Sequence, residues 1–136
     1  MEDLRQAIKA RLSGDATLAA LAPGGVFYGK APQAAVFPFV IFSQSASVRR
    51  SSFGQANAGD TDRWMIKGVA RERVSQASLI DARARALMTD PTLALNANVL
   101  LYCRPEGAMP QQPETDNGET FYQIGTIYRI EIEPLA

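Results

Sequence analysis

The groups in this chain that could carry out chemistry are carboxylates, hydroxyls, lysines and one thiol, because the sequence contains no histidine. Without imidazole, no Ser-His-Asp or Cys-His nucleophile and no histidine metal ligand can be built. The remaining catalytic option is a carboxylate or a serine acting with a lysine, such as Asp62 or Glu72 with Lys67. Nothing in the sequence groups these residues, so a small enzyme is the weaker hypothesis and we predict a protein that is not an enzyme.

The cysteine and the acidic residues do not form a recognisable metal or cofactor site. Cys103 is the one cysteine, so it cannot form an intrachain disulfide or a four-cysteine zinc site, and its apolar surroundings indicate a buried, inert thiol. The aspartates and glutamates at 60, 62, 114, 116 and 119 lack the spacing of a calcium loop and are better explained as turn formers. The glycines form no phosphate-binding loop. We therefore predict no metal and no cofactor.

Composition and charge favour one folded unit over residues 1–136. The chain is 46% hydrophobic and 21% charged, which is enough to build a single core. Lys plus Arg and Asp plus Glu both number 14, so the net charge is zero and the general attraction to nucleic acid is absent. No apolar run approaches the roughly 20 residues that cross a bilayer, and the start lacks a signal-peptide pattern. Neither a specific nucleic acid nor a membrane is expected as a partner.

The first third of the chain predicts two helices followed by two strands. Apolar residues recur every three to four positions over Glu2–Ser13, which indicates an amphipathic helix. Asp15 is placed to cap a second, short helix over Ala16–Leu21. After a Pro-Gly-Gly break, strands are predicted at Val26–Tyr28 and from Phe39 to about Ser47.

The remainder predicts three more strands and one long helix. Alternating apolar residues indicate strands at Trp64–Arg71, Val99–Arg104 and Phe121–Glu133, and Trp64 is expected to anchor the core. A helix is predicted over Ser75–Thr89, with Asp81 and its arginines off the apolar stripe. The expected fold class is α+β: a mostly antiparallel or mixed sheet of four to five strands, packed by an N-terminal helix and a central helix.

Two polar connections exceed the usual four to six residues. Arg49–Thr61 and Pro105–Thr120 are read as long loops, the first of them mobile in the free protein. They could be tolerated insertions, because loop-closure entropy grows slowly with length. We favour partner-binding arms that order on contact. The residues predicted to bind partners are Arg49, Arg50, Phe53, Gln55, Asn57, Asp60, Met109, Gln111, Glu114 and Asp116.

The amino-acid sequence of residues 4–44 resembles that of a known protein family. This stretch contains a Leu- and Ala-rich helix, an Asp-capped short helix, a Gly-Gly turn, and then VFYGKAPQ and FPFVIF. It resembles the tail-completion proteins of tailed bacteriophages, a family related to the lambda-type tail terminator. Later features agree in kind, among them the helix ending in LMTDPTLAL.

The resemblance implies one tail-terminator-like domain without catalytic activity. Such a protein forms a ring, usually of six copies, at the head-proximal end of the tail tube, where it ends tube polymerisation and provides the surface that joins the head connector. Its implied partners are further copies of itself, the tail tube protein, and the head connector or a head-completion protein. Its implied location is the tail or neck of the virion, after assembly in the host cytoplasm.

Alternatives remain open within and outside this family. A neck or head-to-tail joining adaptor of the same fold would share the ring and differ in its neighbours. A monomeric adaptor that binds peptides at a sheet edge is the alternative from another class. In the ring hypothesis, Arg49–Thr61 contacts the tube or lines the lumen, and Pro105–Thr120 reaches a neighbour or the head side.

Overall fold

The computed structural model describes residues 2–52, 55–71, 73–89, 91, 93, 95, 98–109, 114–116 and 119–134. The strands form one mixed sheet with a main path of five strands, ordered β1-β2-β3-β6-β4, and the short β5 also pairs with β6. The β1–β2 pair is parallel and the other pairs are antiparallel. The α+β prediction is confirmed. The elements are α1 (Glu2–Ser13), α2 (Ala16–Leu21), β1 (Val26–Tyr28), β2 (Phe39–Ser52), β3 (Gln55–Arg71), α3 (Val74–Met88), β4 (Asn98–Ala108), β5 (Glu114–Asp116) and β6 (Glu119–Pro134).

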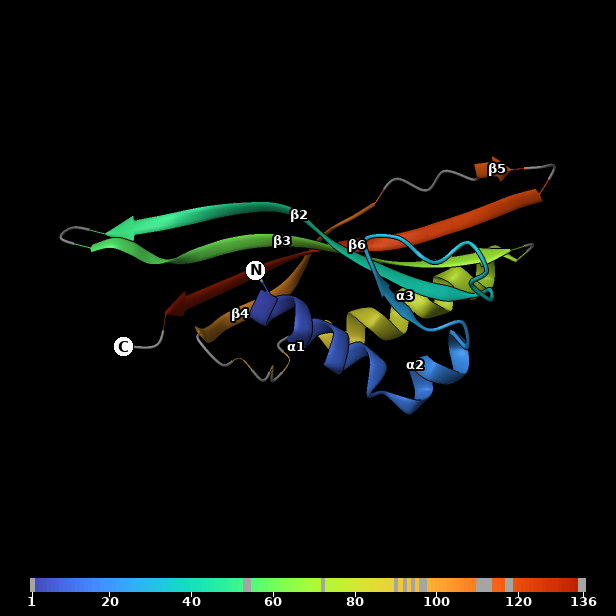
Figure 1. Ribbon diagram of the computed structural model, residues 1–136, viewed down its shortest axis with the longest axis horizontal. Helices are drawn as coiled ribbons and strands as arrows, with labels where there is room; N and C mark the ends of the chain where they lie inside the picture. Colours follow the sequence, from blue (N-terminus) through green and yellow to red (C-terminus); the bar gives the residue numbers. More distant parts are fainter. Residues whose placement is uncertain are drawn as a thin grey trace.

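The three helices lie together on one face of the sheet and leave much of the other face uncovered (Figure 1). α1 turns Leu4, Ile8 and Leu12 inward, and all three are almost fully buried. The four-residue spacing of these leucine and isoleucine side chains is the apolar period that predicted the helix. The bounds of α1, α2 and β1 agree with the prediction, and α3 begins and ends one residue earlier than expected.

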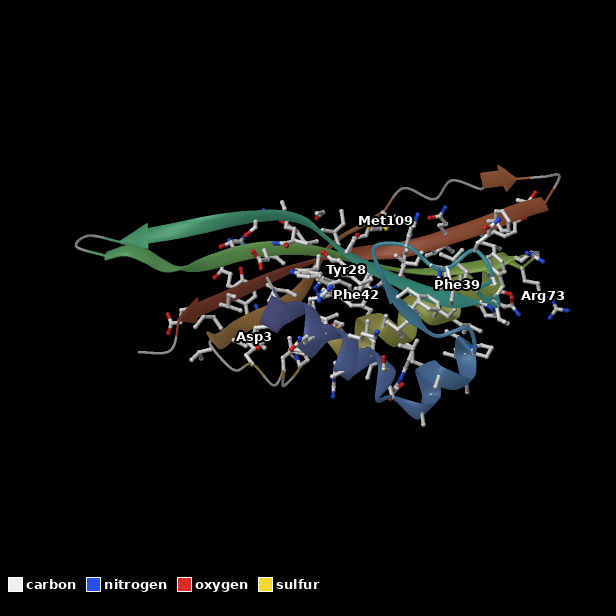
Figure 2. All side chains as sticks on the ribbon, viewed as in Figure 1. Asp3, Tyr28, Phe39, Phe42, Arg73 and Met109 are labelled. Atoms are coloured by element: carbon white, nitrogen blue, oxygen red, sulfur yellow. The ribbon has the colours of Figure 1, made fainter. Side chains whose placement is uncertain are left out.

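The core lies between this helical layer and the sheet. Trp64 of β3 faces Tyr128 of β6 in register, and both side chains are fully buried. Trp64 also stacks on Phe42 with ring centroids 6.1 Å apart, and the Tyr28 ring meets Phe42 edge-on (Figure 2). Even-numbered residues of β3 and β6 therefore face the helices and odd-numbered residues face away, because side chains alternate along a strand. The predicted core position of Trp64 is confirmed.

The close approach of α3 to β3 depends on Gly68. A Cβ atom at this position would lie 2.7 Å from both Cβ and Cγ2 of Ile80 and 3.1 Å from the Ala77 carbonyl oxygen. These distances are shorter than van der Waals contact, so no larger residue fits without moving the helix. The glycine is thus required by packing.

Asp15 joins the two shorter helical segments to α3. Its side chain caps α2 by accepting a hydrogen bond of 2.8 Å from the Leu18 N–H, which confirms the predicted cap. It also accepts two hydrogen bonds from Arg83 of α3, at 2.7 and 2.9 Å. The Arg83 guanidinium and then the Leu18 N–H lower the pKa of Asp15 to about 2.

The prediction of a long loop over Arg49–Thr61 is wrong. β2 continues to Ser52 and β3 begins at Gln55, with Arg49 opposite Asp60 and Ser52 opposite Gln55. A hairpin ladder is formed by backbone groups, so it needs no apolar side-chain period. The sequence pattern detects strands that bury one face, and this part of the hairpin gave no such pattern.

The prediction of a long loop over Pro105–Thr120 is also wrong for much of its length. β4 continues to Ala108, β5 covers Glu114–Asp116, and β6 begins at Glu119. Pro105 is tolerated because β4 is the outer strand of the main path, where a missing N–H costs little. The register shifts between Pro105 and Gly107.

We expect Gly68→Ala to destabilise the protein by about 1–3 kcal/mol, because the added methyl group collides with α3. Denaturant unfolding measures the change. Gly107→Ala is the matched control, since a Cβ atom there meets nothing within 4 Å. Equal unfolding midpoints for Gly68→Ala and the native protein would contradict the packing argument.

We expect Asp15→Asn to lower the unfolding temperature by a few degrees at neutral pH. The pKa of Asp15 is depressed from 3.8 to about 2, so the stability that its charge contributes is present above pH 3.8 and disappears as the pH falls toward 2. The difference between the native protein and the variant should shrink over that range. Thermal unfolding followed by circular dichroism tests this, and a difference independent of pH would refute it.

Candidate interaction surfaces

The first group of predicted partner residues lies on a projecting hairpin. Within the described residues, Gln55 and Gly59 pair with β2 and not with β6, whereas Asp60 pairs with both strands. The ends of β2 and β3 extend past the helical layer (Figure 1). We call residues 49–60 the hairpin arm. It carries five of the predicted residues on its strands, namely Arg49, Arg50, Gln55, Asn57 and Asp60, while Phe53 lies outside the described residues.

Two residues of the second group, Glu114 and Asp116, lie at the opposite end of the sheet. Glu114 and Asp116 belong to β5, which pairs with the start of β6 far from the hairpin arm (Figure 1). Met109 follows β4, and its N–H donates to the Gly125 carbonyl at 3.0 Å. Gln111 lies outside the described residues. The structure therefore places Glu114 and Asp116 far from the hairpin arm and Met109 nearer the middle of the sheet, and it does not combine the described residues of the two groups into one site.

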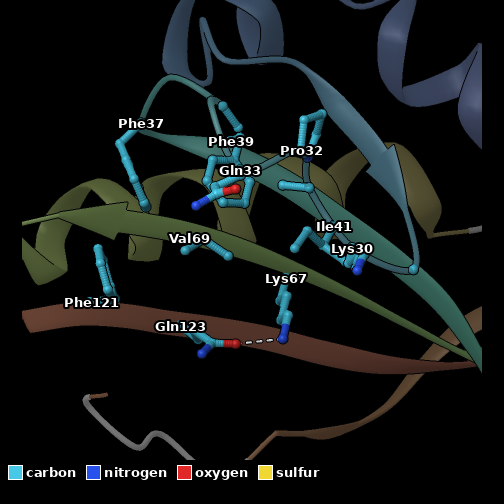
Figure 3. A pocket seen from close by; sticks show the side chains of 13 residues that line it. Lys30, Pro32, Gln33, Phe37, Phe39, Ile41, Lys67, Val69, Phe121 and Gln123 are labelled. Carbon is cyan, nitrogen blue, oxygen red and sulfur yellow. Dashed lines mark hydrogen bonds between the residues drawn. The ribbon is translucent and has the colours of Figure 1, made fainter. Parts of the chain in front are cut away.

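The face of the sheet without helices carries an apolar pocket of about 340 Å³ that the sequence reasoning missed. The segment between β1 and β2 passes over this face, and Phe39, Ile41 and Val69 form an apolar cluster beneath it (Figure 3). At the side of the pocket, Lys67 Nζ donates a hydrogen bond to Gln123 Oε1 (Figure 3). The alternation of β3 could have indicated this second apolar surface, because Val69 lies on the face opposite Trp64.

Arg71 lies beside two stacked rings, Phe37 and Phe121, that line this pocket. Phe37 and Phe121 are stacked with ring centroids 5.2 Å apart. The Arg71 guanidinium carbon lies 4.5 Å from the centre of the Phe37 ring and 5.7 Å from that of Phe121. A guanidinium near aromatic faces is attractive, so Arg71 helps to fix both rings where the end of β3 lies beside the start of β6.

Three arginines lie side by side across the same face. Arg63 of β3 pairs in register with Arg129 of β6, which pairs in register with Arg104 of β4. We call these residues the arginine row. Arg63 forms a two-pronged ion pair with Glu106, at 2.8 and 3.2 Å. This pairing holds the pKa of the Glu106 carboxyl below its usual value.

Tyr102 and Glu131 complete the surroundings of the arginine row. Arg129 Nη2 lies 2.8 Å from Glu131 Oε1. The Tyr102 ring centre lies 5.5 Å from the guanidinium carbon of Arg104 and 5.9 Å from that of Arg129. Burial and then the Glu131 carboxylate raise the pKa of Tyr102. The row is thus a network of cations, carboxylates and one aromatic ring that spans three strands.

Two buried acidic residues, Asp81 and Asp62, are held by hydrogen bonds within the fold. Asp81 was expected off the apolar stripe of α3, but it is 6% exposed. It accepts hydrogen bonds of 2.8 Å from Thr126 and 2.7 Å from Arg85, which satisfy the buried carboxylate. Asp62 is fully buried and accepts a hydrogen bond of 2.6 Å from Ser47.

The combination of Asp62 with Lys67 does not form. Asp62 lies on the helix-facing side of β3, while Lys67 lines the pocket on the opposite side. Glu72, the other carboxylate considered with Lys67, lies outside the described residues. Within the described part of the chain, His, Cys, Asp and Glu side chains form no group of three or more that could hold a metal ion. In the same residues, no helix is long and apolar enough to cross a bilayer.

Cys103 is buried in the core. Its side chain has no exposed surface, and Sγ lies 3.1 Å from the Met88 carbonyl oxygen, to which it donates a hydrogen bond. The prediction of a buried thiol is confirmed.

A family model described as "Tail completion protein gp17" matches residues 6–128. Among solved structures, a chain of the virion of the native gene transfer agent particle superposes with a TM-score of 0.73 at 18% identity, covering 97% of this chain and 96% of that chain. The bacteriophage SPP1 gp17 protein superposes with a TM-score of 0.55 at 14% identity, covering 99% and 90%. These two likenesses establish a shared fold. The search of curated proteins finds no match.

We expect Cys103 to react very slowly with an aromatic disulfide reagent in native buffer and rapidly in denaturant, because only unfolding exposes its sulfur. Absorbance of the released thiolate measures both rates. The variant Leu101→Cys in a Cys103→Ala background provides an exposed comparison on the same strand, since Leu101 is 44% exposed. A native rate for Cys103 equal to that of Cys at the exposed position would contradict its burial.

Proposed function

The chain belongs to the tail completion protein gp17 family, and on that premise we propose that it is a non-catalytic structural protein of the phage virion that completes the tail. In this proposal residues 1–136 act as one domain, and six copies form a ring at the head-proximal end of the tail tube. The ring ends tube polymerisation and presents a surface to the head connector or a head-completion protein.

The hairpin arm is the structural feature that supports the proposed contact with the tail tube. It projects from a body held together by the helical layer, so it can reach a partner without disturbing the core (Figure 1). β1 pairs with Val40–Phe42 of β2. Beyond Phe42, no described strand covers the outer edge of β2. Exposed backbone groups along a strand can add a strand from a partner, which suits docking on a tube built from repeated subunits.

A ring needs two different surfaces on each copy. The hairpin arm, the β5–β6 end and the face without helices supply three candidates in separate places. The zero net charge of the chain keeps repulsion between neighbouring copies small. These features support an assembly protein and assign no residue a catalytic role.

A neck or head-to-tail joining adaptor of the same fold is the second candidate. It is favoured by the β5–β6 end, which projects on the side of the molecule opposite the hairpin arm and offers a second contact surface (Figure 1). In the terminator the hairpin arm acts on the tube and controls tail length. In the adaptor the β5–β6 end dominates and controls the attachment of heads.

We expect a shortened hairpin arm to abolish control of tail length while the protein stays folded. Deleting Ser52–Gly59 leaves Arg50 and Ser51 between the paired residues Arg49 and Asp60. Changing these two to Asn-Gly provides a two-residue turn suited to a hairpin. Tails assembled with this variant should be longer than normal, as measured by electron microscopy.

The matched control keeps the length of the hairpin arm. It replaces Asn57 and its flanking alanines by serines, which preserves the ladder and should preserve tail length. Circular dichroism and thermal unfolding check that the deletion variant is folded. Normal tail length with the shortened arm would refute the terminator, and normal tails that fail to bind heads would favour the adaptor.

A further inference from the structure

We propose that the pocket on the face without helices binds an extended segment of a partner protein, which inserts a large apolar side chain into the pocket and places a carboxylate against Lys30. A protein is chosen as the partner because the chain is proposed to be a structural part of the virion, so the inference rests on the proposed function. It adds a binding site on the body of the molecule, apart from the hairpin arm.

The lining of the pocket suits an apolar side chain. Phe39, Ile41 and Val69 form the buried apolar cluster of this face, and the stacked rings of Phe37 and Phe121 line the same pocket (Figure 3). Ligand sites are typically concave and mainly apolar, with a few polar groups and volumes of roughly 300–1,000 Å³. The volume of about 340 Å³ lies within that range.

The charge of the pocket selects the second feature of the partner. Lys30 and Lys67 line the pocket, and none of the described lining residues is acidic. Lys67 is held by its hydrogen bond to Gln123, whereas Lys30 is exposed in the segment that crosses the face (Figure 3). A cation at the edge of an apolar site favours a ligand of opposite charge and disfavours a basic one. We therefore assign the carboxylate of the partner to Lys30.

The width of the pocket indicates an extended segment. Phe39 of β2 pairs in register with Val69 of β3, which pairs with Gln123 of β6, and all three residues line the pocket. Three strands spaced about 4.8 Å apart span about 10 Å, which is the length of roughly three extended residues. Side chains two positions apart in an extended segment point the same way. The expected ligand thus has an acidic residue two positions from a large apolar one.

A different protein fits this description better than a second copy of the chain. Outside the helices, the large hydrophobic side chains that the described residues expose are Tyr28, Val36, Val99 and Leu101. No acidic residue stands two positions away from any of them. Leu79 does precede Asp81 by two positions, but both belong to α3 and Asp81 is buried.

A defined peptide tests the site on the full chain. The probe is acetyl-Gly-Glu-Thr-Phe-Thr-Glu-Gly-amide, which carries a carboxylate two positions from the ring on either side. Nuclear magnetic resonance titration of the ¹⁵N-labelled protein should show saturable shifts at the amides of Lys30, Ile41 and Val69. A peptide with Ala in place of Phe should bind at least about tenfold more weakly, because it leaves the pocket unfilled. A peptide with Gln in place of both Glu residues should bind about threefold more weakly, since exposed ion pairs contribute little.

Variants of the protein separate a direct contact from a general charge effect. Lys30→Glu should weaken binding of the Glu peptide, and it should bind a peptide with Lys in place of both Glu residues more tightly than the native protein does. Lys9→Glu is the matched control, because Lys9 is exposed on α1 and undergoes the same change of charge. It should bind the Glu peptide like the native protein.

A second variant fills the pocket instead of changing its charge. Ala35 is a half-buried lining residue, so Ala35→Trp should occupy the space and remove binding of the Glu peptide. Thermal unfolding checks that this variant is folded. If it is not, the charge exchange at the exposed Lys30 still decides the result.

The proposal is overturned if the Glu peptide gives no saturable shifts at the pocket up to about 5 mM, or if the Glu and Gln peptides bind equally. It is also overturned if the native protein self-associates and Lys30→Glu or Ala35→Trp abolishes that association, because a second copy then occupies the pocket. These measurements use the isolated chain and do not require tails. Absence of peptide binding, together with loss of tail-length control on shortening the hairpin arm, rejects this site alone. Peptide binding together with normal tails rejects the terminator alone.

Discussion

The long antiparallel ladder between β3 and β6 is the constraint on which the rest of the structure depends. It runs in register from Asp60 opposite Ile132 to Arg71 opposite Phe121. Because side chains alternate along a strand, a slip of one residue between β3 and β6 would put Trp64 and Tyr128 on opposite faces of the sheet, and one of them would leave the core. The ladder thus decides which face the helices cover, and it also sets the arginine row and the pocket on the opposite face.

One face of this sheet forms the core that stabilises the fold, and the other face carries candidate interaction surfaces. On one face, the buried core and the close contact at Gly68 hold α3 against β3, and Asp15 links α2 to Arg83. The other face carries a pocket and a charged network at intermediate exposure. Both ends of the sheet extend past the helices (Figure 1). A body with a rigid core and projecting strands suits a protein whose task is to contact several neighbours.

The errors of the sequence reasoning have one physical origin. Helices and half-buried strand segments leave an apolar period in the sequence, so the helices, β1, the start of β2 and the end of β3 were located within one residue. The hairpin arm and the ends of β4 and β6 are held by backbone hydrogen bonds, to which side chains contribute little period. They were therefore taken for loops. Asp81 was misplaced for a related reason, since its buried partner Thr126 is 45 positions away in the chain.

The sequence by itself determined the helices, the strands that bury one face, the Asp15 cap, the absence of histidine chemistry and the family resemblance. Each of these depends on neighbours within a few positions or on composition alone. Only the tertiary structure decided which arginines share a row, which carboxylates are buried and where the pocket opens. These features join residues from separate strands, and their positions follow from strand register and helix packing, which local patterns do not specify.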